Sequence, residues 1–180
     1  NFTEQTSNTV NLLTGVTAFS STTAWFCGVG GVISKTTDGG VSWGAQSSGV
    51  STTLYDIRFN TVSNGLCVGD QGKILRTVNG GTTWTSVSSG TTNALRSVFY
   101  ASATVVFVAG HGGALLKSTD GGATWAVLSS GTTANLIGCH FISTTEGYAC
   151  GVNGTILKTT NGGTNWSAQS TGTTKYFTKI

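Results

Sequence analysis

Apolar residues occur along the chain in short runs at regular spacing, and turns that contain glycine separate these runs. One series consists of WFCG, LCVG, FVAG and YACG, at 25–28, 66–69, 107–110 and 148–151. After a tight glycine turn, each is followed by a second run: VISKT, KILRT, ALLKS and TILKT. Short runs rich in β-branched and apolar residues, bounded by glycine turns, are typical of strands joined in hairpins.

The runs belong to a repeat of 41 residues, because Trp43, Trp84, Trp125 and Trp166 follow one another at that interval. The repeats span about 12–52, 53–93, 94–134 and 135–175. Each copy predicts four strands. The first lies around 16–18, 57–59, 98–100 or 139–141, and the last opens at the tryptophan. A period of about 40–45 residues with four strands per unit indicates propeller blades. We therefore predict an all-β fold, a β-propeller-type repeat protein of four blades within a single domain, 1–180.

The two ends do not fit complete blades. Phe2 falls one repeat before Trp43, so residues 1–11 are expected to form an isolated last strand. Residues 173–180 align with 132–139, the approach to a first strand. Two explanations stay open: the chain is a piece of a larger propeller, or the surplus strands pair with neighbouring molecules. A head-to-tail contact that does not close would give a filament.

The segment before each tryptophan carries a second signature. The four copies are KTTDGGVSW, RTVNGGTTW, KSTDGGATW and KTTNGGTNW. They resemble the Asp-box, or bacterial neuraminidase repeat, with the pattern S/T-x-D-x-G-x-T/S-W. The matching residues are Thr36, Asp38, Gly40, Trp43, Thr77, Asn79, Gly81, Trp84, Ser118, Asp120, Gly122, Trp125, Thr159, Asn161, Gly163 and Trp166. The whole repeat looks like the blades of the photosystem II assembly-factor-like propellers, with related blades in sialidases, endoglucanases and sortilin-type receptors.

The Asp-box residues are expected to be structural. An Asp or Asn side chain can accept backbone N–H groups across a turn, and glycine allows left-handed conformations. Tryptophan buries a large apolar surface between neighbouring units. In the families that the repeat resembles, the motif lies at the blade periphery, away from active sites. The boxes therefore predict a fold rather than an activity.

The composition of the chain excludes some classes of function. Only 8% of the residues are charged and the net charge is +3, without a Lys/Arg cluster, which argues against nucleic acid as a partner. No apolar run approaches the roughly 18 residues of a membrane span. Because the chain begins at Asn1 without methionine, we expect a processed chain or a fragment. A recurrent base, at Lys35, Arg76, Lys117 and Lys158, indicates either a solvated strand face or a ring for an anionic glycan or acidic partner.

The four cysteines favour an extracellular or cell-surface protein. None belongs to a CxxC pair, and the histidines lack zinc-site spacing, so we expect no metal and no cofactor. An even number of cysteines in a Ser/Thr-rich chain fits two disulfides, and the repeat frame suggests Cys27–Cys67 between blades and Cys139–Cys150 within one. Sequons at Asn1, Asn153 and Asn165 are candidates for N-glycosylation.

The sequence gives little support for a catalytic site. Outside the boxes the acids are Glu4, Asp56, Asp70 and Glu146, and nothing favours any two of them as the facing carboxylates of a glycosidase. Neither histidine has an evident Ser or Cys partner. We therefore expect no enzymatic activity. The sequence predicts a secreted structural or interaction protein that self-assembles with copies of itself or binds another extracellular protein. The alternatives are a glycan-binding or glycosidase-like module and an assembly factor for a membrane protein complex.

Overall fold

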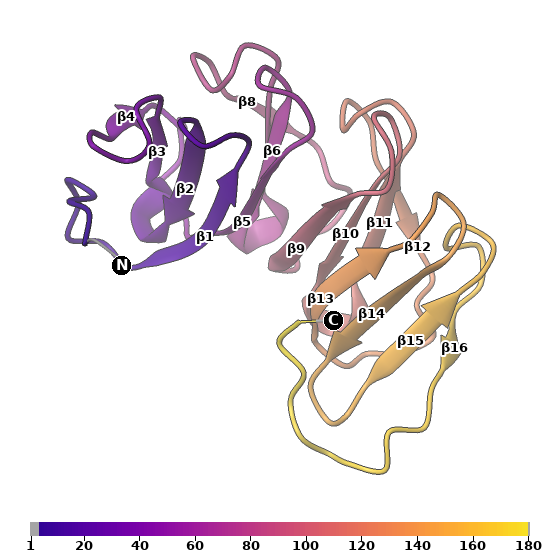
Figure 1. Ribbon diagram of the computed structural model, residues 1–180. Helices are drawn as coiled ribbons and strands as arrows, with labels where there is room; N and C mark the ends of the chain where they lie inside the picture. The colour runs from indigo at the N-terminus through magenta and orange to yellow at the C-terminus, as the bar shows by residue number, and fades with distance from the viewer. Residues whose placement is uncertain (1–3, 180) are drawn as a thin grey trace.

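The chain forms four four-stranded antiparallel sheets in series, which confirms the predicted propeller blades. The computed structural model describes residues 4–179, and Figure 1 shows the blades following one another in an open arc. Blades 1 and 2 contain β1 (Leu13–Ala18), β2 (Ala24–Gly28), β3 (Ile33–Thr36), β4 (Gly44–Gln46), β5 (Leu54–Phe59), β6 (Gly65–Gly69), β7 (Ile74–Thr77) and β8 (Thr85–Val87). Blades 3 and 4 contain β9 (Leu95–Tyr100), β10 (Val106–Gly110), β11 (Leu115–Ser118), β12 (Ala126–Leu128), β13 (Leu136–Phe141), β14 (Gly147–Gly151), β15 (Ile156–Thr159) and β16 (Ser167–Ala168).

A tight turn joins the second and third strands of every blade. In three blades it is a short 3-10 helix: Val29–Gly31, Asp70–Gly72 and His111–Gly113. The last position of the turn requires glycine for steric as well as conformational reasons. At Gly72, φ is +67° and a Cβ atom would lie 1.9 Å from the carbonyl oxygen of Thr91, on the strand connection to the next blade. A side chain at this position would push the turn away from that connection.

The core lies between the blades rather than within one of them. Three buried clusters join blades 1 and 2, blades 2 and 3, and blades 3 and 4. Trp25 stacks on Phe59 with ring centroids 3.7 Å apart, and Phe107 stacks on Phe141 at 3.6 Å. The first strands β1, β5, β9 and β13 contact one another in sequence and line the inner side of the arc (Figure 1). The arc is thus a row of sheets held face to face.

Neither terminal segment is a regular strand in the part of the chain that the structure describes. The predicted strand 1–11 is wrong for residues 4–11, and the predicted strand 173–180 is wrong for residues 173–179. Residues 1–3 and 180 lie outside the described residues. Both segments nevertheless bond to the blade beside them. Gln5 Nε2 donates to the carbonyl oxygen of Gly39, and the N–H of Phe177 donates to the carbonyl oxygen of Gly151. With the bonds from Asn8 Nδ2 to the carbonyl oxygen of Trp43 and from the N–H of Gly154 to the carbonyl oxygen of Lys175, these contacts stay scattered and do not make a regular strand.

Candidate binding surface on the inner strands

The Asp-box side chains close their own turns. Asp38 Oδ1 accepts hydrogen bonds from Thr36 Oγ1 at 2.7 Å and from the N–H of Ser42 at 3.0 Å. Asn79 Oδ1 accepts the N–H of Thr83 at 2.9 Å in the same way. The box tryptophans Trp84, Trp125 and Trp166 pack on the three interblade clusters. Their contacts are those of a structural motif.

Asp38 gives a test of the box. Hydrogen bonds from Ser42, and then from Thr36, lower the pKa of this exposed carboxyl from 3.8 to about 2. Stability from the ionised form is therefore present above pH 3.8 and lost as the pH falls through about 2. We expect Asp38→Ala to lower the melting temperature at pH 7, with a gap to the unchanged chain that shrinks in acid. Asp38→Asn should cost less, because Asn79 makes the same backbone bond; a larger loss would contradict this role.

Two of the four recurrent basic residues join one blade to the next. Arg76 Nε donates to the carbonyl oxygen of Gly121 at 3.1 Å, and Lys117 Nζ donates to that of Gly162 at 2.8 Å. Lys117 also lies over the ring of Phe107. Lys158, at the end of the arc, instead pairs with Glu146 at 2.9 Å. At Arg76 and Lys117 the basic position is therefore part of the blade interface, rather than a solvated face or a ligand ring.

The residues that depart from the repeat gather on the inner strands. In each first strand the pairing register shifts by one residue, which is a β-bulge. The four bulged residues are Thr14, Tyr55, Arg96 and Ile137. A bulge re-aims a side chain and is frequent beside binding sites. The backbone feature is thus repeated, while the side chain that it presents differs in every blade.

The two central bulges form a cluster across blades 2 and 3. The Arg96 guanidinium carbon lies 3.8 Å from the centroid of the Tyr55 ring. The Tyr55 hydroxyl donates to Asp70 Oδ1 at 2.9 Å, and burial is the main cause that raises the pKa of Tyr55. Partial burial and the charge of Arg96 lower the pKa of His111. Stacking on an aromatic face holds a guanidinium while its N–H edge stays available.

A second group lies further along the same strands. Asp56 is buried and accepts the backbone N–H of Ile57 and that of Val98 in the next blade, both at 3.0 Å. Arg58 Nε lies 3.5 Å from Asp56 Oδ1, with 40% of the Arg58 side chain exposed. The Phe99 ring is 4.6 Å from that of the exposed His140. The inner strands of blades 2–4 therefore present cationic and aromatic groups together.

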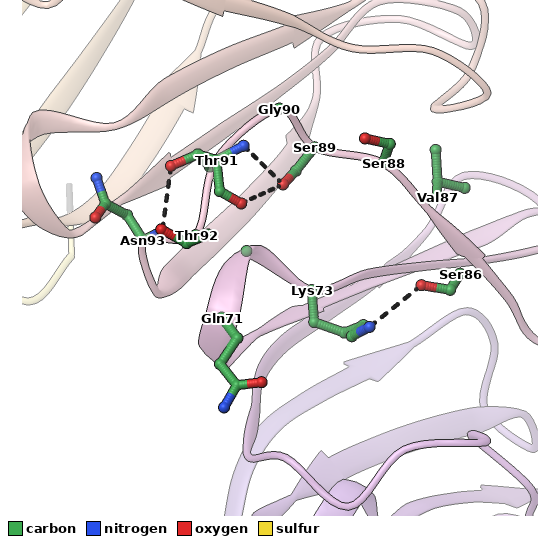
Figure 2. A pocket seen from close by; sticks show the side chains of 11 residues that line it. Gln71, Lys73, Ser86, Val87, Ser88, Ser89, Gly90, Thr91, Thr92 and Asn93 are labelled. Atoms are coloured by element: carbon green, nitrogen blue, oxygen red, sulfur yellow. Dashed lines mark hydrogen bonds between the residues drawn. The ribbon is translucent and has the colours of Figure 1, made fainter.

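Beside this surface, blade 2 has a shallow polar groove of about 830 Å³ between its 3-10 turn and the connection to blade 3. Figure 2 shows that its hydroxyls bond to one another and to the backbone: Ser89 Oγ donates to the carbonyl oxygen of Thr91 at 3.0 Å. Lys73 Nζ lies 3.4 Å from Ser86 Oγ on the far side. Small-molecule sites are mostly enclosed and apolar, and this groove is neither. The inner strands, which suit an extended chain, are therefore the better candidate binding surface.

Sequence reasoning missed Tyr55, Arg96 and Phe99 as a group, although a signal was present. In an array of near-identical repeats, positions where the copies differ in chemistry are free of the common packing role. At the bulge the copies have Thr, Tyr, Arg and Ile, and three residues later they have Thr, Arg, Phe and His. In residues 4–179, no group of His, Cys, Asp and Glu could hold a metal ion. The described helices include none long and apolar enough to cross a membrane.

The family model for the photosynthesis system II assembly factor YCF48 matches residues 43–132 and 85–160, which is more than half of the chain. The chain belongs to the YCF48 family. Among solved structures, YCF48 bound to D1 peptide is similar with a TM-score of 0.73 and 18% identity, over 90% of this chain and 54% of that one. YCF48 from Cyanidioschyzon merolae gives 0.72 and 16%, over 94% and 59%. This YCF48-family chain thus spans little more than half the length of those proteins.

The propeller of an ancestral GH74 enzyme is also similar, with a TM-score of 0.77 and 18% identity, over 94% of this chain and 27% of the enzyme. At such identity the likeness shows the fold alone. No curated protein sequence matches the chain. Membership of the YCF48 family confirms the resemblance drawn from the Asp-boxes.

The family membership corrects the predicted function. A secreted fibre that assembles from copies of the chain is wrong, and so is the prediction that its partners are such copies or another extracellular protein. The YCF48 structure that resembles the chain has a D1 peptide as its partner. The physical error lay in the terminal segments, which bond to blades 1 and 4 of their own chain instead of standing free. The assembly-factor alternative agrees with the family.

All four cysteines are buried, and the structure joins none of them in a disulfide. Cys139–Cys150 is wrong as a disulfide. Cys150 pairs with Gly138 and Cys139 pairs with Ala149, so the two side chains point to opposite faces of the sheet. Cys27 and Cys67 belong to one cluster between blades 1 and 2, and burial, followed by contact with Cys27, raises the pKa of Cys67. Cys27–Cys67 stays a prediction.

The glycosylation sites also stay predictions, as does an extracellular location. Asn153 is exposed in the turn between β14 and β15, with a φ of 56°. Asn165 is exposed in the fourth Asp-box, where its N–H donates to Asn161 Oδ1. Asn1 lies outside the described residues.

Proposed function

We propose that the chain is a non-catalytic binding propeller of the assembly-factor type, which holds a peptide segment of a membrane-complex subunit against its inner strands. One observation carries the proposal. The side chains that break the repeat, with Tyr55 and Arg96 at their centre, lie together on the inner strands of a YCF48-family fold. An extended peptide offers backbone carbonyls and side chains to such groups, and stacked arginine and aromatic residues are frequent anchors of interfaces.

The carboxylates support a binding role rather than catalysis. The Asp56 carboxylate accepts two backbone N–H groups and forms an ion pair with Arg58. The Asp70 carboxylate accepts the Tyr55 hydroxyl. Glu146 pairs with Lys158 on the open face of blade 4. A glycosidase needs two carboxyl groups that face the same bond across a cleft. Each of these three acids is instead bound to a partner in the fold.

The proposal predicts that a synthetic D1 peptide binds the chain, and that Arg96→Ala weakens the affinity at least tenfold, about 1.4 kcal/mol. Loss of the guanidinium removes both the charge and the group that stacks on Tyr55. Isothermal titration calorimetry at two salt concentrations measures the effect. Circular dichroism should show that the variant stays folded, because Arg96 is only half-buried.

Lys73→Ala is the matched control, since it removes a positive charge from the polar groove outside the inner strands. It should leave the affinity within about twofold. No binding of the D1 peptide to the unchanged chain would contradict the proposed function. Equal losses for Lys73→Ala and Arg96→Ala would move the binding site to the groove.

A further inference from the structure

Two thiols face each other in the interface between blades 1 and 2. Cys27 on β2 and Cys67 on β6 are both 0% exposed and belong to the cluster that joins these blades. Cys27 points towards blade 2, since a Cβ atom on Gly15 would lie 3.0 Å both from the Cys27 sulfur and from the Cα atom of Asp56. Cys67 points towards blade 1, because its neighbour Val68 packs towards blade 3 and successive side chains of a strand alternate between faces.

The repeat places this pair of positions independently of the thiols themselves. One repeat later the pair is Val68 and Val108, which share the cluster between blades 2 and 3. Two repeats later it is Ala109 and Ala149, which share the cluster between blades 3 and 4. The same two positions thus meet in every interface, and the first interface has thiols where the others have aliphatic side chains.

We propose that Cys27 and Cys67 are an oxidation-sensitive cross-linking site, at which a disulfide forms across the interface and locks blade 1 onto blade 2. The link would close a loop of one blade, which restricts the unfolded chain and stabilises the folded one. The remaining cysteines do not compete for this bond. Cys139 and Cys150 point to opposite faces of blade 4.

The oxidant is a low-molecular-weight disulfide such as oxidised glutathione. In the closed interface, burial followed by contact with Cys27 raises the pKa of Cys67, which keeps this group an unreactive thiol. When the interface opens, one cysteine thiolate attacks a sulfur of the oxidant and releases one small thiol. The second thiolate attacks the mixed disulfide and releases the other. The two small thiols carry away the two protons and two electrons that the protein loses, and the rate should follow the opening of the interface.

The test oxidises the unchanged chain with oxidised glutathione, blocks the remaining thiols with iodoacetamide in urea, and maps tryptic peptides by mass spectrometry. Trypsin leaves Cys27 in peptide 1–35 and Cys67 in peptide 59–73, with the other two cysteines together in 118–158. We expect 1–35 joined to 59–73, two hydrogen atoms lighter than their sum. The melting temperature of the oxidised chain should lie at least about 5 °C above that of the reduced chain.

The matched controls replace both cysteines with alanine or both with valine, the pairs that the other two interfaces have at these positions. Each variant should melt at the same temperature in oxidising and reducing buffer, since its remaining cysteines form no link. Oxidation during refolding from urea gives the oxidant access when the folded interface opens slowly. Iodoacetamide on both Cys27 and Cys67 after that refolding, or a link from either to 118–158, would overturn the proposal. A joined chain that melts no higher than the reduced chain would show that the link does not lock the blades, and would overturn it as well.

Discussion

Replacing Phe107 with alanine is expected to lower the free energy of unfolding by about 3–5 kcal/mol. Phe107 is wholly buried on β10, its ring stacks on Phe141 of the next blade at 3.6 Å, and Lys117 Nζ lies 5.4 Å from the centroid of the same ring. Alanine would leave a cavity at the interface of blades 3 and 4. Because stability in repeat arrays comes from interfaces between neighbours, that cavity weakens the attachment of the whole fourth blade. Urea denaturation followed by tryptophan fluorescence measures the loss.

Tyr148→Ala is the matched control for Phe107→Ala. Tyr148 has the same place in blade 4, with Lys158 over its ring, but it is only half-buried. Its loss should cost about 1 kcal/mol, typical of a partly exposed side chain. Equal costs at the two positions would mean that the stability of this fold does not come from packing between blades.

The sequence predicted the blades because their evidence is local and repeated. Glycine turns, strand runs and Asp-boxes each recur at one interval, so four copies support the same interpretation. The bonds from Arg76 and Lys117 to the next blade were not predicted, since the carbonyl groups they reach lie 45 residues away. From the sequence alone, a basic residue at a strand end is interpreted as solvated, because the turn of the next blade that it contacts is not known.

The cysteines show a second limit. The hairpin of β13 and β14 pairs Phe141 with Gly147 and Cys139 with Ala149, one residue away from a register that would place Cys139 opposite Cys150. A shift of one residue turns every side chain to the other face, so Cys139 and Cys150 point apart. The β-bulge that presents Tyr55 and Arg96 in blades 2 and 3 was not predicted either. The hairpin register therefore accounts for the wrong disulfide, and the bulge accounts for the missed binding surface.

Asp56→Ala is expected to lower the free energy of unfolding by about 2–3 kcal/mol at pH 7, because two buried N–H groups would lose their acceptor. One of them belongs to Val98, so the carboxylate ties blade 2 to blade 3. Ser97, one repeat later, accepts the backbone N–H of Cys139 at a longer distance of 3.4 Å and contacts the Cys139 sulfur at 3.8 Å. Ser97→Ala is therefore the control, with an expected cost of about 1 kcal/mol.

The cost of Asp56→Ala should grow in acid. Burial, the largest effect, raises the pKa of Asp56 above 3.8, although Arg58 and the two N–H groups oppose it. Stability linked to a raised pKa is fully present below the unfolded value and is lost as the pH rises through the folded value. The unchanged chain therefore gains from Asp56 between neutral pH and pH 4, and the alanine variant does not. Asp38→Ala should show the opposite trend, because hydrogen bonds lower the pKa of Asp38. Denaturation at several pH values separates the two, and a cost at Asp56 that falls in acid would mean that its ion pair with Arg58 outweighs burial.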